Sequence, residues 1–475
     1  MLRRALHPAS LLALFASVAL AAPDATTSSA AGVARDLGAA RTDAATAAKA
    51  FAEAGLDPAA AARLLRELRP AEQGPPSTAR SAQRLELSDD HGTSSQLEVI
   101  VPRAPRKDGR YGLLVVLHGL RGNAGQLLEF AERIAPEGTI IAAPNAQWIP
   151  PEREGEDATL LAQMLLGAQA APAQDAPAEG EDSQSAKRRK QLQRLAEQGH
   201  RAAFPHWWSY QPDSFPLRAI DAVRRRWPID PDRVVLTGYS MGGYGTWNVG
   251  LRYEDRFAAI APFAGGISRL ENVQPRDDRS RALLTNAAHL PVFVVHGDAD
   301  PVVPVRFSRT ITDELRGLGG DVTYEEVPGG PHVLMPFLRG DERTKHLTAW
   351  LADRVRDPHP KKVVHSALGA YHGASYWVKI EELTGESATV TAEVTARDRI
   401  VVTTRGVTKL RLFLDPALVD AEAPITVEVD GRIVHVGVVA PSLESVAASF
   451  AGRGDATFVQ ERSVVVELGA PVREF

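Results

Sequence analysis

Residues 233–247 read RVVLTGYSMGGYGTW, and this stretch decides the fold. A β-branched run that ends in G-x-S-x-G and passes into a helix-like segment predicts a strand, a tight turn and a helix. Gly238 and Gly242 let the strand and the helix approach closely, so the turn holds the hydroxyl of Ser240 out at the end of a sheet. A glycine-rich turn with a surface serine is the alternative, but the strand before the motif and the Gly-Gly within it favour a nucleophile.

Two backbone amides are expected beside Ser240. The first belongs to Met241, because the turn points the unpaired amides at the start of the helix toward the place where an oxyanion would form. The second is expected after residues 111–118, a near-continuous apolar run that is typical of a buried parallel strand. The run ends in His118-Gly119-Leu120, and we assign the second amide to Leu120. An ordinary strand-to-helix loop is the alternative.

A serine nucleophile needs a base to accept its proton and an acid to orient that base. In a sheet of this kind the acid and then the base follow the serine, each on a loop after a strand. The strand predicted at 291–295 delivers two carboxylates, Asp298 and Asp300. We choose Asp300 as the acid, because it lies deeper in the loop and Pro301 fixes its turn, and we expect a structural role for Asp298.

His332 follows the strand predicted at 322–327, in a loop of glycine and proline. A histidine in such a loop can reach across to the serine, so we identify His332 as the base. The chain has 13 histidines, and a surface or packed role is the alternative for any of them. His332 has a predicted strand directly before it and follows Ser240 and Asp300 in the chain. In contrast, His346 lies in the following helix and His296 at the end of a strand.

Apolar strand-like runs alternate with helix-like segments between residues 85 and 357. A hairpin is predicted over 85–102, with further strands at 139–143 and 257–263. Helical spacing occupies 213–227, and another helix follows the serine. This order predicts the α/β class, with a doubly wound, mostly parallel sheet and helices on both faces. We therefore expect the catalytic domain to occupy residues 85–357.

Residues 150–203 depart from this pattern, because acidic and basic blocks flank a tract of proline, alanine and glutamine. Such a low-complexity stretch predicts a solvated, partly helical insertion. A lid over the site is the functional alternative, since the stretch is long for a connection. Trp207 and Trp208 close the stretch and are candidates for the wall of a substrate pocket, although aromatic residues more often pack in cores.

Residues 1–22 are typical of a secretory signal peptide, with an arginine pair before an apolar core and expected cleavage after Ala21 or Ala22. The apolar run is shorter than the roughly 20 residues that span a bilayer, so we expect no stable membrane anchor. The chain has no cysteine, which fits export to a bacterial periplasm or to the medium. Residues 23–84 follow as an alanine-rich leader and N-terminal helices, and the part up to residue 45 is expected to be flexible.

From residue 361 to 475 β-branched runs recur between turn signals, so we predict a small C-terminal antiparallel β domain. Asp430-Gly431 marks a hairpin turn, and a helix is expected near 443–450. Tyr376 and Trp377 are candidates for contact with a glycan or a surface. Packing of an accessory sheet against the catalytic domain is the favoured alternative.

Three motifs together resemble one family. The serine motif at 238–247, the HGDADPVVP loop at 296–304 and the histidine at 332 look like the catalytic domain of prolyl-oligopeptidase-like and carboxylesterase-like α/β-hydrolases. The resemblance covers roughly residues 95–356, but no segment before it is long enough for the β-propeller that gates true prolyl oligopeptidases. It implies that Ser240 is the nucleophile, Asp300 the acid and His332 the base. It also implies that the amides of Leu120 and Met241 bind the oxyanion.

Composition excludes several other functions. A net charge of −5 and a pI near 6.3 give no indication of nucleic-acid binding. We find no metal-ligand spacing, dinucleotide fingerprint or P-loop, so we expect neither a metal nor a cofactor. The leading hypothesis is an exported serine hydrolase that cleaves small carboxylic esters. A peptidase of the same class is one alternative, and a non-catalytic protein that binds a surface polymer on a hydrolase scaffold is another.

Overall fold

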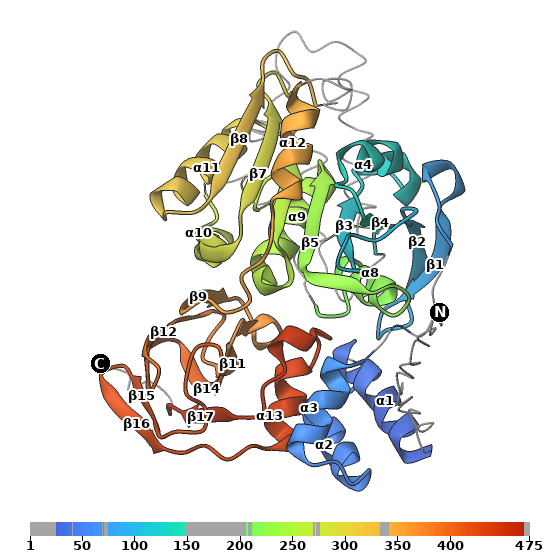
Figure 1. Ribbon diagram of the computed structural model, residues 1–475. Helices are drawn as coiled ribbons and strands as arrows, with labels where there is room; N and C mark the ends of the chain where they lie inside the picture. The colour runs from blue at the N-terminus through green and yellow to red at the C-terminus, as the bar shows by residue number, and fades with distance from the viewer. Residues whose placement is uncertain are drawn as a thin grey trace, which may run out of the picture.

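The computed structural model describes residues 25–39, 41–68, 70, 75–147, 206–207, 211–268, 271, 276–332 and 342–469. They form a region built on a large sheet, a C-terminal region with two smaller sheets, and a group of N-terminal helices (Figure 1). The predicted α/β class with a smaller C-terminal β region is confirmed. The expected signal peptide and the insertion at 150–203 lie outside the described residues. No helix of the described part is long and apolar enough to cross a bilayer.

The large sheet has eight strands. They are β1 (Gln83–Ser88), β2 (Ser94–Ile100), β3 (Tyr111–Leu117), β4 (Thr139–Pro144), β5 (Ile229–Tyr239), β6 (Ala259–Phe263), β7 (Val292–Gly297) and β8 (Val322–Val327). Their order is β1-β2-β4-β3-β5-β6-β7-β8. The predicted hairpin forms β1 and β2, which pair antiparallel, as do β2 and β4. All neighbours from β4 to β8 pair parallel, so their carboxyl ends meet at one edge.

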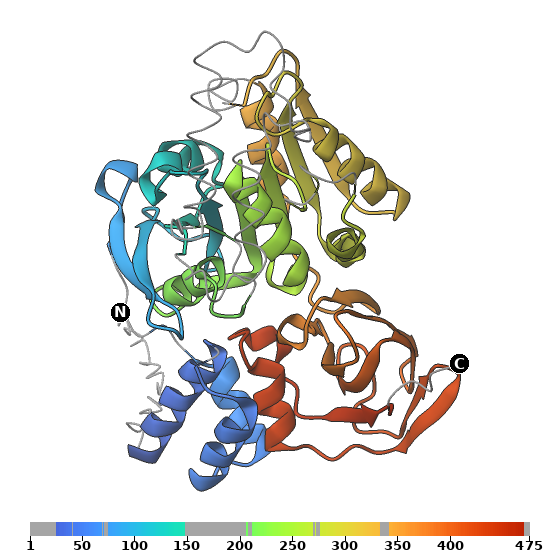
Figure 2. The same ribbon diagram turned by 180° about the vertical axis from the view of Figure 1, so that it is seen from behind.

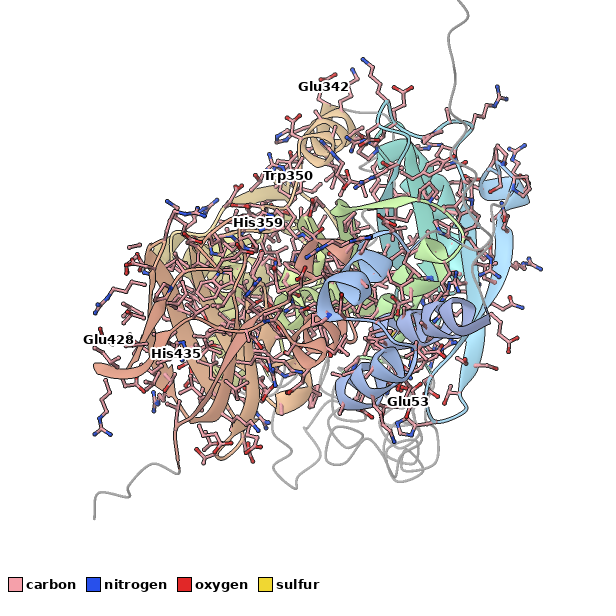
Figure 3. All side chains as sticks on the ribbon, turned by 60° about the horizontal axis from the view of Figure 1, so that its bottom comes forward. Glu53, Glu342, Trp350, His359, Glu428 and His435 are labelled. Carbon is pink, nitrogen blue, oxygen red and sulfur yellow. The ribbon has the colours of Figure 1, made fainter. Side chains whose placement is uncertain are left out.

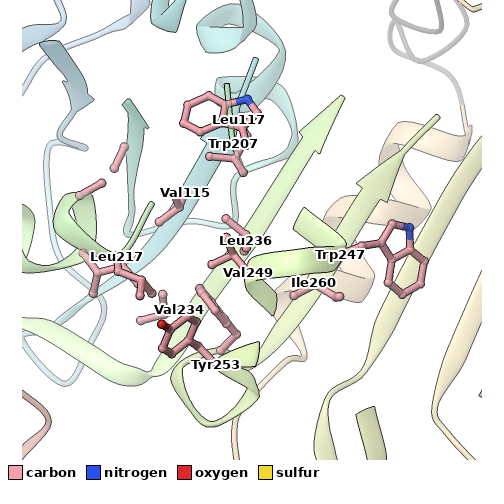
Figure 4. Close-up of a cluster of buried hydrophobic side chains, with 14 of the residues drawn as sticks. Val115, Leu117, Trp207, Leu217, Val234, Leu236, Trp247, Val249, Tyr253 and Ile260 are labelled. Atoms are coloured by element: carbon pink, nitrogen blue, oxygen red, sulfur yellow. The ribbon is translucent and has the colours of Figure 1, made fainter. Parts of the chain in front are cut away.

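Helices cover both faces of this sheet. On one face lie α8 (Phe215–Arg224), α9 (Met241–Arg252) and α11 (Arg306–Gly317); on the other lie α4 (Leu128–Ile134) and α12 (Glu342–Ala352). Successive side chains of a strand point to opposite faces, so Val115 of β3 enters the first core and Val116 enters the second. Figure 4 shows the first core, where Trp247 and Val249 of α9 lie over the strands. Burial on both faces explains the near-continuous apolar runs.

The N-terminal helices pack against the far end of the chain. They are α1 (Ala25–Gly38), α2 (Ala44–Glu53) and α3 (Pro58–Arg66), and they lie beside α13 (Leu443–Phe450) in both views (Figures 1 and 2). The prediction of a flexible leader up to residue 45 was wrong, because Ala34 and Leu37 of α1 are fully buried. Alanine gives little apolar signal in the sequence, but it lets helices approach closely once a partner surface is present.

The C-terminal region contains two sheets. Its strands are β9 (Lys362–Ala367), β10 (Ala374–Ser375), β11 (Val378–Leu383), β12 (Ala388–Ala396), β13 (Arg399–Arg405), β14 (Val407–Phe413), β15 (Ile425–Val429), β16 (Arg432–Gly437) and β17 (Ser463–Glu467). The sheet orders are β10-β11-β14-β17 and β16-β15-β13-β12-β9. Neighbours pair antiparallel as predicted, except that β13 and β15 are parallel. Figure 3 shows Glu428 and His435 on β15 and β16 at the outer end of this region, away from Glu342 and Trp350 on α12.

Tyr376 and Trp377 do not lie on the surface of the C-terminal region. Their exposed fractions are 1% and 3%, and the indole of Trp377 donates a hydrogen bond to the carbonyl of Pro360. Both rings pack in the core of the smaller sheets and are not available to a glycan, so the suggestion for these two residues was wrong. The amide of Tyr376 donates a hydrogen bond to Asp255 of the larger region, so this part of the C-terminal region does lie against that region.

Buried ion pairs join the two sheet regions. Arg356, just after α12, contacts Asp232 at 2.6 Å and Asp455 of the C-terminal region at 2.8 Å. Glu254 contacts His365 of β9 at 2.8 Å. Because such charges lose their hydration on burial, they require partners in fixed positions. These ion pairs therefore fix the position of one region against the other.

Candidate active site

Ser240 lies in the tight turn between β5 and α9, as predicted. Its backbone has φ 57° and ψ −116°, a strained conformation for a residue with a side chain. The flanking glycines make this turn sterically feasible. A Cβ atom on Gly242 would lie 2.0 Å from the carbonyl oxygen of Leu117, and one on Gly238 would lie 2.4 Å from the carbonyl oxygen of Gly242. The serine is therefore presented at the carboxyl edge of the parallel sheet.

The structure brings three of the predicted residues into one hydrogen-bonded chain. Ser240 Oγ lies 2.8 Å from His332 Nε2, and His332 Nδ1 lies 2.7 Å from Asp300 Oδ2. An ionised carboxylate only accepts hydrogen bonds, so the proton of His332 resides on Nδ1 and its Nε2 accepts the hydroxyl proton of Ser240. The three residues follow β5, β7 and β8, whose carboxyl ends lie at the same edge.

Asp300 is held by more groups than the sequence indicated. Its Oδ1 accepts hydrogen bonds from the amides of Val302 and Val303 at 2.8 and 2.9 Å, and His296 Nε2 lies 3.4 Å from its Oδ2. His296 Nε2 also donates to the carbonyl of Val303 at 2.9 Å. Burial favours the neutral acid, but the nearby His296 and the hydrogen bonds from His332 and the two amides outweigh it and hold the pKa of Asp300 well below its usual range. His296 is thus part of the site, although sequence reasoning set it aside.

Asp298, the competing carboxylate, has a different position. Its Oδ1 accepts a hydrogen bond from the amide of Gly329 at 2.6 Å. This contact ties the loop after β7 to the loop after β8, three residues before His332. The geometry agrees with the expected structural role of Asp298.

A second residue missed from the sequence is Tyr239, directly before the nucleophile. Its hydroxyl donates a hydrogen bond to the backbone carbonyl of His332, and the two rings lie 5.2 Å apart between centroids. Burial, together with the charge of Asp300, raises the pKa of Tyr239, so the phenol remains a donor. The position before the serine in the motif was the available signal, but the sequence does not show which loop the ring would meet.

The loop that carries Leu120 lies against the nucleophile. A Cβ atom on Gly119 would be 3.5 Å from Ser240 Cβ, so this loop and the start of α9 both border the serine. His118 fixes the loop: its Nε2 accepts the amide of Ala146 at 3.0 Å, which leaves Nδ1 to donate to the carbonyl of Gly119 at 2.8 Å. Burial lowers the pKa of His118, so its ring is neutral and keeps this tautomer.

Trp207 lies beneath this loop and not in an open pocket. It is 2% exposed, and its indole N–H donates a hydrogen bond to the carbonyl of His118 at 2.8 Å. A Cβ atom on Gly245 of α9 would lie 2.6 Å from the Cβ of Trp207, so the ring packs directly on the helix after the nucleophile (Figure 4). The prediction that Trp207 walls a substrate pocket was wrong, and Trp208 lies outside the described residues.

Comparison with known proteins finds similarity over part of this region. The family model described as Phospholipase/Carboxylesterase matches residues 215–337, from α8 to just beyond His332. The domain has the α/β-hydrolase fold that the resemblance implied. Its matched part is similar to phospholipases, carboxylesterases and acyl-protein thioesterases.

Two curated relatives and one solved structure show the extent of the similarity to this α/β-hydrolase. An uncharacterized secreted protein of Arthroderma benhamiae is 32% identical over 161 residues, which is 29% of this chain and 17% of that protein. Acyl-protein thioesterase 1 of Gibberella zeae is 30% identical over 112 residues, which is 23% of this chain and 44% of the relative. The chain thus spans less than half of either relative. A thermostable esterase of known structure is 23% identical, with 58% of this chain and 63% of the esterase covered and a TM-score of 0.33.

Proposed function

We propose that this α/β-hydrolase cleaves carboxylic esters, including thioesters, through a Ser-His-Asp acyl-enzyme mechanism. The observation that carries the proposal is the hydrogen-bonded chain from Ser240 through His332 to Asp300. A serine hydroxyl becomes a competent nucleophile when a neutral imidazole accepts its proton and a carboxylate fixes the tautomer of that imidazole.

In the acylation step Ser240 Oγ attacks the carbonyl carbon, and its proton passes to His332 Nε2. Asp300 stabilises the imidazolium without taking the proton. The tetrahedral intermediate collapses when His332 returns the proton to the leaving alkoxide or thiolate. Water then repeats both steps on the acyl-enzyme and releases the acid. The amides of Leu120 and Met241 are the proposed oxyanion donors, each worth about 3–4 kcal/mol in the transition state.

Esters are a better substrate class than peptides for this site. An alkoxide or thiolate leaves the tetrahedral intermediate more readily than an amide nitrogen does, because the nitrogen must first be protonated. Leu120 and Val302, on two loops that carry site residues, have exposed fractions of 37% and 52%. These apolar side chains suit the acyl chain of a small ester. Thioesters belong to the same class of acyl donor, and one relative is named as a thioesterase.

Labelling with a fluorophosphonate probe and turnover of p-nitrophenyl esters test the proposal. Ser240→Ala is expected to abolish labelling and to lower kcat by about a million-fold, the loss seen when a triad acts as a unit. Ser94→Ala, at an exposed position at the start of β2, is the matched control and should leave both readouts unchanged. If the parent protein is not labelled, the alternative of a binding protein on a hydrolase scaffold replaces this proposal.

The preference for esters has its own test. Turnover of an ester series with increasing acyl length is compared with turnover of aminoacyl anilides on the same enzyme. We expect ester hydrolysis to exceed anilide hydrolysis throughout. Robust anilide hydrolysis with negligible ester hydrolysis would show a peptidase.

We also propose that the enzyme is exported and acts on small molecules, with neither a nucleic-acid partner nor a stable membrane anchor. The support is the signal-peptide pattern of residues 1–22. N-terminal sequencing of the protein expressed in a bacterium is expected to start just after Ala21 or Ala22, in the periplasmic or extracellular fraction. Uncleaved protein confined to the cytosol would contradict export.

A further inference from the structure

A cavity of about 410 Å³ lies where α1, α3, α8 and the loop after α13 meet. It is separate from the candidate active site. Arg110 and Ile229, which line it, lie just before β3 and at the start of β5, so the cavity is at the amino edge of the parallel sheet. Ser240 lies at the carboxyl edge. The N-terminal helices, the large-sheet region and the C-terminal region meet at this place (Figures 1 and 2). Residues of all three line the cavity, so a ligand in it would contact all three at once.

The lining of this cavity is strongly basic. Among the described residues, seven arginines and two aspartates line it, and neither lysine nor glutamate does. The arginines come from all three parts of the chain, and they include Arg35 of α1, Arg224 of α8, Arg225 directly after α8, and Arg453 of the C-terminal loop.

Carboxylates neutralise only part of this charge. The guanidinium of Arg224 donates to the carbonyl of Arg453 at 2.6 Å and has its nearest carboxylate, Asp221, at 3.8 Å. Within the described part of the chain, Arg35 and Arg225 form no ion pair, and Arg225 donates only a long hydrogen bond of 3.4 Å to the carbonyl of Arg35. Carbonyl oxygens satisfy donors but do not cancel charge.

The electrostatics of the cavity agree with a missing negative charge. Burial lowers the pKa of Arg224 and that of Arg453, and it raises the pKa of Asp221 even though Arg224 and Arg256 oppose the shift. Arg453 is already paired with Asp255 at 2.8 Å, so the charge that lacks a close carboxylate is on Arg35 and Arg225 and, in part, on Arg224. Partly buried cations without close counter-charges are costly to the fold. An anion bound between them would recover part of that cost.

We propose that this cavity binds an organic phosphate monoester. Guanidinium groups recognise phosphate oxygens through paired hydrogen bonds, and the two negative charges of a phosphate match the excess of positive charge better than one carboxylate does. The remaining walls are apolar, with Leu65, Ile220, Trp227 and Phe450 among them. They accommodate the organic part of the ligand, so the ligand is amphiphilic.

Isothermal titration at constant ionic strength tests the proposal with phenyl phosphate, inorganic phosphate, benzoate and phenol. Phenyl phosphate is expected to bind most tightly, because it supplies both the dianion and the apolar ring. Inorganic phosphate should bind about tenfold more weakly, and phenol should not bind. Benzoate that binds as tightly as phenyl phosphate would overturn the assignment to phosphate, and the absence of any anion binding would overturn the site.

Arg225→Gln and Arg35→Gln locate the binding in the cavity, because neither side chain is committed to an ion pair. Each is expected to weaken phenyl phosphate binding about tenfold. Exposed Arg103→Gln is the matched control and should bind as the parent does. Thermal unfolding confirms that the variants are folded, and ester turnover should stay within about twofold of the parent value. Unchanged affinity in both cavity variants would show that phenyl phosphate binds elsewhere.

Discussion

At the scale of single residues, Asp300 uses both carboxylate oxygens. One accepts the amides of Val302 and Val303, and the other accepts His332, with His296 close by. These contacts fix the plane of the carboxylate and therefore the plane of the imidazole. They also keep the pKa of Asp300 below its ordinary value, so the acid stays charged when His332 gains a proton. The orienting role thus depends on the whole loop after β7.

Asp300→Asn is expected to lower kcat for ester hydrolysis by about 10⁴-fold, because an amide no longer enforces the tautomer with the proton on Nδ1. Asp298→Asn is the matched control, since within the described residues the side chain of Asp298 bonds the amide of Gly329 and not His332, and the substitution should cost less than about tenfold. Steady-state kinetics on both variants measures the difference. Equal losses, or a larger loss for Asp298→Asn, would reverse the assignment of the acid.

The residues of the candidate site differ in how far the sequence could predict them. Ser240, Asp300 and His332 follow from the order of strands and loops, because parallel strands bring their carboxyl ends together. The contact of His296 with Asp300 depends on how the loop after β7 folds back over the carboxyl end of that strand. The sequence contains no local pattern for that, nor for the hydrogen bond from Tyr239 to the His332 loop.

At the scale of elements, the turn between β5 and α9 depends on close backbone approach. Gly242 sits in the first turn of α9, where a side chain would meet the carbonyl of Leu117 on β3. The strand, the turn and the helix therefore act as one unit. Any substitution that pushes α9 away from β3 would also move Ser240 relative to His332.

Gly242→Ala tests this unit. It is expected to destabilise the fold by about 1–3 kcal/mol through overpacking and to lower ester turnover at least about tenfold. Gly317→Ala, at the end of α11, is the matched control because a Cβ there meets nothing within 4 Å. It should leave activity unchanged and raise stability by up to about 1 kcal/mol. Chemical denaturation and kinetics are the measurements; a Gly242→Ala enzyme of parental activity would contradict the expectation.

Strands were predictable from the sequence where both of their faces are buried. The parallel strands are covered on both faces and appear in the sequence as apolar runs, and α3 begins at Asp57-Pro58, a pair that is typical of a helix start. α1 was missed because its buried face consists largely of alanine. The β-branched runs predicted the class of the C-terminal region but not the pairing of β9 and β17, whose neighbours lie across long stretches of chain.

At the scale of the whole molecule, Asp455 belongs to the buried ion-pair group between the two sheet regions. Burial favours the neutral form of Asp455, but Arg356 and Arg224 outweigh it and lower its pKa from 3.8 to about 2. A carboxyl group with a depressed pKa stabilises the folded state at pH values above its unfolded pKa. That stabilisation is lost as pH falls from about 4 to about 2.

Asp455→Asn is therefore expected to lower the free energy of unfolding by about 2 kcal/mol near pH 7. The difference in the free energy of unfolding between variant and parent should stay constant down to about pH 4 and disappear toward pH 2. Asp353→Asn, an exposed position, is the control and should track the parent. Urea denaturation across this pH range provides the measurement. A difference in unfolding free energy that grows on acidification would contradict the prediction.

The packing of α2 and α3 on α13 also constrains how the protein is made. Phe51 and Leu65 share one core with Val446 and Phe450, which are translated long after them. On the ribosome α1, α2 and α3 can pack against one another, but the part of their apolar surface that α13 covers stays exposed until α13 emerges. The native closure of this core therefore waits for the synthesis of the C-terminal region.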